Sequence, residues 1–438
     1  MPMTLSKLAS ASVGAGSAAA SILSSLRVGA EFVPPAAVVH FRSAYRALPP
    51  TDRVSVLAEI GATTATSHDE EPARFFSTLL DARRGAEDVD GTSGMGFLID
   101  VRADALEARR AHGEPIERVD AALRSLLSAW LHPGHLQIQR VTFRSSAALC
   151  ERIVKYERVH PSRNMSDLRA RLGSGRRCYA LLHPSLPDVP LSMVHCALLD
   201  AIPSSLRDVH TRSSEDAPTN AAFWSISSTQ DGLRGIDLGH ALLKRAVGEL
   251  RAEFSTLAAF HTLSPIPGFR AWLTRQRESA QSAGSVASAA AAASSDVNAR
   301  VSGDADLSVL GDALDVLQSQ LGDVAGDAAG DALADITPSA REAALRLCSR
   351  YLLHAKSGRA SSTAALDPVM NFHCRNGAAV ERLNWAGDPS VRGVRQSGGI
   401  MVNYAYNLDE LAENAESYAR GSVCASDVLM DLADGGAE

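Results

Sequence analysis

The stretch SISSTQDGLRGIDLG, residues 225–239, decides the fold because it runs from a strand through a glycine-bearing loop into a helix. Gly232, Gly235 and Gly239 let backbone N–H groups turn toward one point, and a helix N-terminus adds a partial positive charge. This loop could therefore hold an anion such as a pyrophosphate. Lys244 and Arg245 add positive charge nearby. The alternative is a simple tight turn, because glycines before a helix are often no more than that.

Alternating and short apolar runs on both sides of this loop predict a sheet. Residues 184–190 contain several prolines and connect the strands expected over 178–183 and 191–199, which indicates a hairpin turn. A helix is expected over 239–254, directly after a central strand, which is an α+β pattern led by antiparallel pairs. The expected strands cover residues 136–143, 178–183, 191–199, 222–228 and 256–263.

Helical spacing dominates the chain before this sheet. The Pro49–Pro50 pair ends the first expected helix, and the apolar face of the last one includes Ala121, Leu123 and Trp130. After the sheet, a further helix is expected over 339–355 and a final sheet-like stretch over 371–406. The expected N-terminal helices cover residues 38–48, 51–60, 97–111 and 117–131.

Composition places the chain among ordinary globular proteins and excludes several function classes. The 438 residues include 45% hydrophobic and 21% charged side chains, with a net charge of −7. An acidic balance disfavours nucleic-acid binding, and the absence of an 18-residue apolar run argues against a membrane span. The six cysteines show no C-x-x-C spacing. That argues against a zinc knuckle and predicts reduced, mostly buried thiols in an intracellular protein.

The two ends of the chain bear on its location. Residues 1–30 are rich in Ala, Ser and Gly and carry only Lys7 and Arg27 as charges. An organellar import leader and a disordered tail both fit this composition. The last residues, 434–438, do not present the peroxisomal S-K-L signal. A mitochondrial and a cytoplasmic location are both expected to be compatible with the chain.

Ser264 stands at the end of an expected strand in the block LSPIPGF, residues 263–269. The two prolines that follow fix the backbone, so the Ser264 hydroxyl is held in place and can bond a carboxylate or a carbonyl. A rigid turn capped by Ser264 is the alternative. No G-x-S-x-G motif surrounds this serine, which disfavours a hydrolase nucleophile.

His373 stands in the block NFHCRNG, residues 371–377. Asn371, Arg375 and Asn376 could orient its imidazole or a ligand. Histidine is the commonest proton donor near neutral pH because its ordinary pKa lies there. The chain holds 13 histidines, so a surface or packing role for His373 is the alternative.

These blocks together resemble the malonyl-CoA decarboxylase family. The resemblance runs in order from about residue 41 to residue 406 and is most specific in the second half. Its blocks are RRCY (176–179), FWSIS (223–227), QDGLRGIDLG (230–239), LSPIPGF (263–269), NFHCRNGA (371–378), NW (384–385), RG (392–393) and MVNY (401–404).

The resemblance implies an α+β fold in which an N-terminal helical bundle precedes a catalytic domain similar to the GCN5-related acetyltransferases, a GNAT-like domain. The expected organisation is a flexible leader at 1–36, a helical domain at 37–131 and a GNAT-like domain at 132–438. A low-complexity, partly disordered insert is expected at about 279–335, where Ala, Ser, Gly and Asp dominate.

The resemblance also implies the site residues. The catalytic pair maps onto Ser264 and His373, which belong to the substrate-binding set as well. Asp237 stands where acetyltransferases usually have a glycine, and its carboxylate is expected to face away from the phosphates. The other substrate-binding positions are Arg234, Gly235, Ile236, Asp237, Leu238, Gly239 and His240.

The expected reaction is the conversion of malonyl-CoA to acetyl-CoA and CO₂, which would set the malonyl-CoA level in fatty-acid metabolism. No metal and no cofactor is expected, and the protein is expected to be a homo-oligomer, a dimer or a tetramer. Ser264 would position the malonyl carboxylate or act as an acceptor, and His373 would donate the proton. A CoA-dependent acyltransferase of the same fold and a non-catalytic malonyl-CoA-binding protein are the alternatives.

Overall fold

A computed structural model describes residues 35–63, 71–80, 93–162, 164–286, 333–357 and 363–434. The expected leader therefore lies outside the described residues up to residue 34, and the expected insert lies outside them from 287 to 332. The chain divides into two compact units. The first comprises Met1–Arg169, Cys178–Val194 and Ile226–Ala246, and the second comprises Ala170–Arg177, His195–Ser225 and Val247–Glu438.

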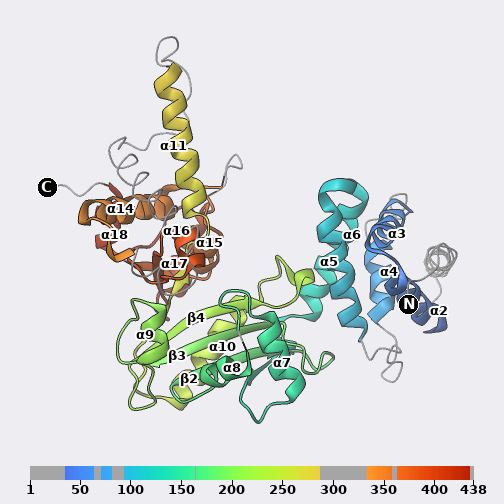
Figure 1. Ribbon diagram of the computed structural model, residues 1–438. Helices are drawn as coiled ribbons and strands as arrows, with labels where there is room; N and C mark the ends of the chain where they lie inside the picture. Colours follow the sequence, from blue (N-terminus) through green and yellow to red (C-terminus); the bar gives the residue numbers. More distant parts are fainter. Residues whose placement is uncertain are drawn as a thin grey trace. The chain divides into compact units, whose positions relative to one another are not determined.

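The first unit contains the predicted helical bundle, drawn from blue to cyan in Figure 1. Its core is aromatic: the rings of Phe41, Phe75 and Phe97 meet edge to face, with centroids 5.5–6.2 Å apart. Such pairs contribute about 0.5–1.5 kcal/mol beyond the area they bury. The helices are α2 (Pro35–Ala47), α3 (Pro50–Thr63), α4 (Glu71–Leu80), α5 (Gly94–His112) and α6 (Glu114–Trp130).

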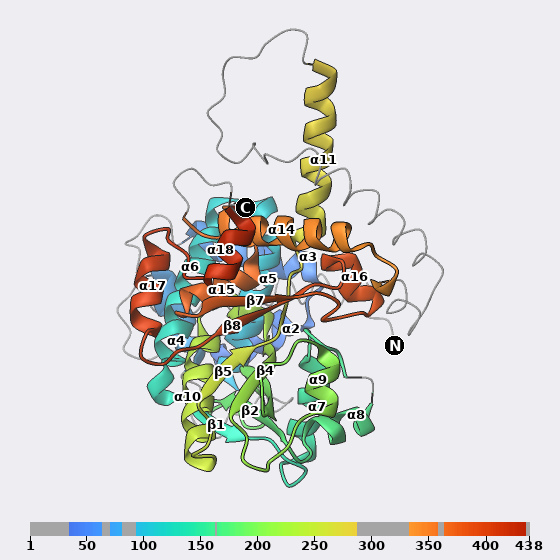
Figure 2. The ribbon, with the colours of Figure 1, turned by 90° about the vertical axis from the view of Figure 1, so that its left-hand side faces the viewer.

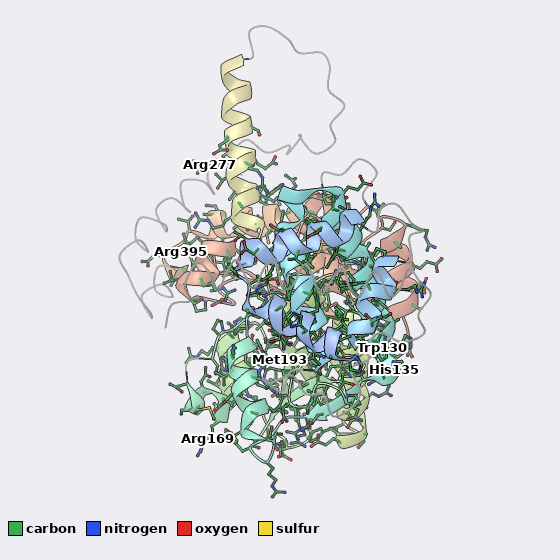
Figure 3. All side chains as sticks on the ribbon, turned by 90° about the vertical axis from the view of Figure 1, so that its right-hand side faces the viewer. Trp130, His135, Arg169, Met193, Arg277 and Arg395 are labelled. Atoms are coloured by element: carbon green, nitrogen blue, oxygen red, sulfur yellow. The ribbon has the colours of Figure 1, made fainter. Side chains whose placement is uncertain are left out.

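Trp130 corrects one detail of this prediction. The periodicity placed it on the buried face of its helix, but Trp130 is 44% exposed. It is the last residue of α6, and its carbonyl oxygen lies 3.3 Å from Nδ1 of His135 in the following turn (Figure 3). No further helical turn follows Trp130 to continue the apolar face, so the helical periodicity does not predict burial at this position.

The first unit also holds an antiparallel pair at the start of the sheet. Gln137 of β1 pairs with Leu182 of β2, but β1 is shorter than the strand predicted over 136–143. Ser145 donates its N–H to the carbonyl of Thr142, and this turn ends the strand. The elements that lie wholly or partly in the first unit are η2 (Pro133–His135), β1 (Gln137–Arg140), α7 (Ala147–Tyr156), α8 (Met165–Arg171), β2 (Arg176–Leu182), β3 (Ser192–Leu199), η3 (Asp231–Leu233) and α10 (Leu238–Glu253).

Eight strands of the described residues form one mixed sheet, in the order β1-β2-β3-β4-β5-β8-β6, with β7 pairing β8. The strands β4 and β5 are parallel and are connected by α10, whereas β8 runs antiparallel to β5, β6 and β7. This agrees with the predicted α+β class, a helical bundle followed by a sheet with a helix after a central strand. The remaining strands are β4 (Asn220–Ser228), β5 (Ala259–Thr262), β6 (Ser264–Pro265), β7 (Ala379–Asn384) and β8 (Met401–Ala405).

Helices of the second unit surround the β7–β8 pair, and Figure 2 shows α14, α15 and α18 on one side of these strands. The long helix α11, which carries Arg277, projects from the unit (Figure 3). Among the described residues, no helix combines the length and the apolar character needed to cross a bilayer. The helices are α9 (Leu206–Thr211), α11 (Phe269–Val286), α14 (Pro338–His354), α15 (Pro368–Arg375), α16 (Val391–Ser397), α17 (Leu411–Ala419) and α18 (Asp427–Asp434).

Two predictions for the second unit were wrong in part. The stretch 371–406 was expected to be sheet-like, but α15 and α16 occupy much of it. Asp367 and Ser390 each accept hydrogen bonds from the first turn of these helices, a capping arrangement that starts a helix. In addition, α11 continues through Val286, into the region expected to be a loop. The prediction of buried thiols is confirmed, since five of the six free cysteines are buried.

Candidate functional site

The second unit brings Ser264 and His373 into direct contact. Ser264 lies in β6, where it pairs with Val402 of β8, and His373 lies on α15. Although 109 positions separate them in the chain, Oγ of Ser264 lies 3.1 Å from Nε2 of His373. Both side chains are buried, with 6% and 3% of their surface exposed. The structure therefore places the two predicted catalytic residues in one site.

The surrounding hydrogen bonds fix where the proton of the imidazole lies. Ser264 donates its hydroxyl proton to Oγ1 of Thr262 at 2.9 Å, and the same oxygen accepts from the N–H of Tyr404. A serine hydroxyl has one proton, so the 3.1 Å contact requires Nε2–H of His373 to donate to Ser264. The other nitrogen, Nδ1, then accepts from the hydroxyl of Tyr406 at 2.8 Å.

Burial keeps this imidazole neutral. The ring of His373 stacks on the ring of Tyr404 with centroids 4.4 Å apart. Removal from water disfavours the charged form and lowers the pKa of His373 to about 3. The ordinary pKa near neutrality, on which its choice from the sequence rested, therefore does not hold at this position.

Asp367 connects the segments that carry the two catalytic candidates. Its carboxylate is fully buried and accepts from the N–H groups of Val369 and Met370, both at 2.9 Å, at the start of α15. It also accepts from the hydroxyl of Tyr351 at 3.2 Å. Gly268, four residues after Ser264, lies directly against Tyr351. A Cβ at this position would stand 2.2 Å from the Tyr351 hydroxyl. This close approach explains the glycine of the LSPIPGF block.

Asn371, one of the three neighbours predicted to orient the imidazole or a ligand, does not bond the imidazole. Asn371 accepts a hydrogen bond from the hydroxyl of Tyr418 at 2.9 Å, and the imidazole is instead held by Ser264 and Tyr406. The sequence prediction missed Tyr406 and Asp367. Two local signals pointed to them: Asp followed by Pro is a helix-start pattern, and Tyr406 follows Tyr404 at strand spacing.

The predicted loop at 234–240 belongs to the first unit. Gly235 has φ +80°, a conformation that favours glycine. Asp237 accepts from the N–H of His240 at 3.4 Å, so its carboxylate caps the start of α10. Arg245 donates to the carbonyls of Leu136 and Pro133. Among the described residues, no group of three His, Cys, Asp or Glu side chains could hold a metal ion.

With this geometry in view, the chain was matched to known proteins. The profile described as malonyl-CoA decarboxylase C-terminal domain matches residues 134–436. The chain belongs to the malonyl-CoA decarboxylase family. The mitochondrial malonyl-CoA decarboxylase of Anser anser anser is 35% identical over 334 residues, covering 74% of this chain and 63% of that protein. The same-named protein of Rattus norvegicus is 34% identical, covering 77% and 68%.

Solved structures of this family extend the likeness to nearly the whole chain. The malonyl-CoA decarboxylase of Cupriavidus metallidurans has a TM-score of 0.70 at 32% identity and covers 96% of this chain and 99% of its own. The malonyl-CoA decarboxylase of Rhodopseudomonas palustris has a TM-score of 0.71 at 27% identity, covering 98% and 99%. The family therefore shares the helical N-terminal part as well as the sheet.

The neutral state of His373 predicts the pH dependence of the site. Because its pKa is lowered to about 3, His373 stays neutral as the pH falls through 6.5, where an ordinary histidine gains its proton. We expect kcat for malonyl-CoA between pH 5.5 and 8 to show no inflection from this residue. The measurement is the steady-state kcat at half-unit steps of pH. A fall in kcat with an apparent pKa near 6.5 would contradict the neutral assignment.

Proposed function

We propose that this protein decarboxylates malonyl-CoA to acetyl-CoA and CO₂. The observation that carries the proposal is the buried hydrogen bond between Ser264 and His373, within a chain of the malonyl-CoA decarboxylase family. The test is to incubate the purified full chain with malonyl-CoA alone and to follow acetyl-CoA and CO₂. Stoichiometric formation of both products is expected, and tight binding without turnover would contradict the proposal.

The chemistry begins with the carbon–carbon bond next to the malonyl carboxylate. When this bond breaks, CO₂ leaves and the electron pair passes into the thioester as an enolate. In the proposed mechanism, the Ser264 hydroxyl turns from Thr262 to the carboxylate and holds it out of the carbonyl plane. The breaking bond then lies parallel to the π system that receives the electrons. A buried site strengthens such hydrogen bonds because water does not compete.

His373 then supplies the proton that the α-carbon requires. A neutral imidazole that gave up Nε2–H alone would become an imidazolate, which is a costly anion in a buried site. The Tyr406 hydroxyl lies 2.8 Å from Nδ1 and can replace that proton as it leaves. His373 thus remains neutral throughout. Nε2 then takes a proton from water and Nδ1 returns its proton to the Tyr406 oxygen, which restores the starting tautomer. In this proposal Tyr406, His373 and Ser264 form one hydrogen-bonded chain, in which Tyr406 and His373 transfer the proton and Ser264 holds the carboxylate.

The Tyr406→Phe variant tests this chain. Phenylalanine keeps the ring and removes only the hydroxyl that faces Nδ1, so kcat is expected to fall about 10- to 100-fold with KM little changed. Steady-state kinetics on malonyl-CoA provide the measurement. Tyr45→Phe is the control, because the Tyr45 hydroxyl donates to the Asp104 carboxylate at 2.9 Å within the helical bundle of the first unit. Wild-type kcat in Tyr406→Phe would remove the tyrosine from the mechanism.

We assign the CoA pyrophosphate to the loop at residues 234–240. Within it, the N–H groups of Arg234, Ile236 and Leu238 already donate to carbonyls of the same segment. The proposed donors to phosphate are therefore the N–H groups of Gly235 and Gly239, together with that of Asp237, at the start of α10. The remaining members, Ile236, Leu238 and His240, position these donors.

A CoA-dependent acyltransferase would need a second substrate to accept the acyl group. The assay with malonyl-CoA as the sole substrate separates the two activities, because a transferase releases no CO₂ from it. A non-catalytic binding protein would bind malonyl-CoA in calorimetry and release neither product. The hydrogen-bonded serine and histidine support the decarboxylase over both.

Two further proposals concern assembly and compartment. We propose a homo-oligomer, a dimer or a tetramer, which the mass from light scattering will test. A mitochondrial location is supported by the names of the goose and rat relatives and by the acid-poor first thirty residues. Imaging of the full chain fused to a C-terminal fluorescent protein tests the location, with cytoplasmic fluorescence as the opposing result.

A further inference from the structure

The loop assigned to the CoA pyrophosphate, and the residues directly before it, accept hydrogen bonds from the helical bundle of the same unit. Arg102 on α5 is 2% exposed and donates from Nη1 to the carbonyl oxygen of Gly232 at 2.5 Å. Arg124 on α6 donates from Nη2 to the carbonyl oxygen of Gly235 at 3.2 Å. Two guanidinium groups from different helices thus bind two carbonyls of the segment 231–240, one in η3 directly before the loop and one in the loop itself.

The backbone of the loop also lies directly on α5. A Cβ at Gly232 would stand 1.8 Å from the carbonyl oxygen of Ile99, so only glycine allows this approach. Arg102 is itself fixed, because its Nε donates to the Asp120 carboxylate at 2.9 Å. The buried positive charge of Arg102 is therefore paired with the Asp120 carboxylate, which also fixes the direction of the guanidinium group.

A third attachment lies at the start of the loop. Arg158 bonds both carboxylate oxygens of Asp231, at 2.8 and 3.3 Å. In a planar trans peptide, the N–H of Leu233 lies opposite the Gly232 carbonyl and the N–H of Ile236 lies opposite the Gly235 carbonyl. Both of these N–H groups donate to carbonyls of the same segment, those of Gln230 and Leu233. The arginines therefore fix the turn that leads into the start of α10, where the proposed phosphate donors lie.

We infer that Arg102 and Arg124 are positioning residues for CoA, through which the helical bundle sets the shape of the pyrophosphate loop. The inference rests on the proposed function of that loop. It gives the N-terminal helices a part in substrate binding without contact with the substrate. Loss of either arginine would weaken the binding of CoA and of malonyl-CoA to the same extent and would leave the rate of the chemical step unchanged.

Arg124 offers the cleaner test because its side chain is exposed and its removal leaves no buried charge. In Arg124→Ala, KM for malonyl-CoA is expected to rise about three- to tenfold with kcat within twofold of wild type. The dissociation constant for CoA, measured by calorimetry, is expected to rise by the same factor. Arg124→Lys, which keeps a charged donor, is expected to restore most of the affinity.

Arg118→Ala is the matched control, since Arg118 lies on the same helix and pairs with Glu114. An unchanged KM in Arg124→Ala, a fall in kcat alone, or an equal rise in Arg118→Ala would overturn the inference. Arg102→Lys adds a second measurement, with a rise in the CoA dissociation constant expected. Calorimetry with CoA keeps this test separate from the proposed activity, because it does not require turnover.

Discussion

The His373→Ala variant is expected to lose about 10²- to 10⁴-fold in kcat for malonyl-CoA, the range that a positioned proton donor typically contributes. In this protein the imidazole lies within 3.1 Å of Ser264 and 2.8 Å of Tyr406, so its removal interrupts the proposed hydrogen-bonded chain at the centre. The carbanion would then be protonated only by water that reaches a buried site. Steady-state kinetics and CO₂ release measure the loss.

Binding should survive this change. In the proposed binding mode, malonyl-CoA is held mainly through its nucleotide end, so its dissociation constant in His373→Ala, measured by calorimetry, is expected to remain within a few-fold of wild type. His354→Ala is the matched control, because His354 is exposed on α14 and its Nε2 lies 3.6 Å from a carboxylate oxygen of Asp434. Near-normal turnover in His373→Ala, with CO₂ released at the wild-type rate, would remove the proposed role of the imidazole.

The Ser264→Ala variant is expected to lose about 10- to 100-fold in kcat/KM, the effect of one hydrogen bond to a charged group. The loss is expected to be shared between kcat and KM, because the hydroxyl would hold the malonyl carboxylate both before and during bond breaking. The variant also leaves Nε2–H of His373 without its acceptor. Initial rates over a range of malonyl-CoA concentrations separate the two terms.

The double variant Ser264→Ala/His373→Ala sharpens this test. Groups in one hydrogen-bonded chain act as a unit, so the combined loss should be clearly smaller than the product of the single losses. Ser77→Ala is the control, since Ser77 lies on α4 of the first unit and its exposed hydroxyl donates to the carbonyl of Arg74. An unchanged kcat/KM in Ser264→Ala would eliminate the serine from the site.

The sequence predicted the elements of this fold best where the pattern is long and regular. Four of the five described helices of the N-terminal bundle and the strand-loop-helix of residues 225–254 were found at nearly their observed bounds, whereas α4 (Glu71–Leu80) was not predicted. The prediction was wrong for 371–377, where a short helix carries His373, because eight residues hold too few turns to show a helical period. It was also wrong for Trp130, which stands at a helix end.

For the candidate site, the sequence supplied the residues and their chemistry but not their surroundings. Ser264 and His373 were identified from their blocks, whereas Tyr406 and Asp367 were missed because the local pattern indicates only a strand and a helix start there and does not show which residues pack around His373. The pKa of His373 could not be predicted either, since it depends on burial under Tyr404.

The amino-acid sequence by itself determined the helical N-terminal part and the strands and helix around residues 225–254, the glycines of the loop and the serine and histidine of the site. These features depend on local backbone preferences and on side-chain chemistry, so they can be predicted from short segments of the sequence. Only the tertiary structure decided that β6 and α15 meet, that Tyr406 holds Nδ1, and that α5 and α6 support the loop. Pairing between distant segments and exclusion of water arise only from packing, and they set both the geometry and the protonation state of the site.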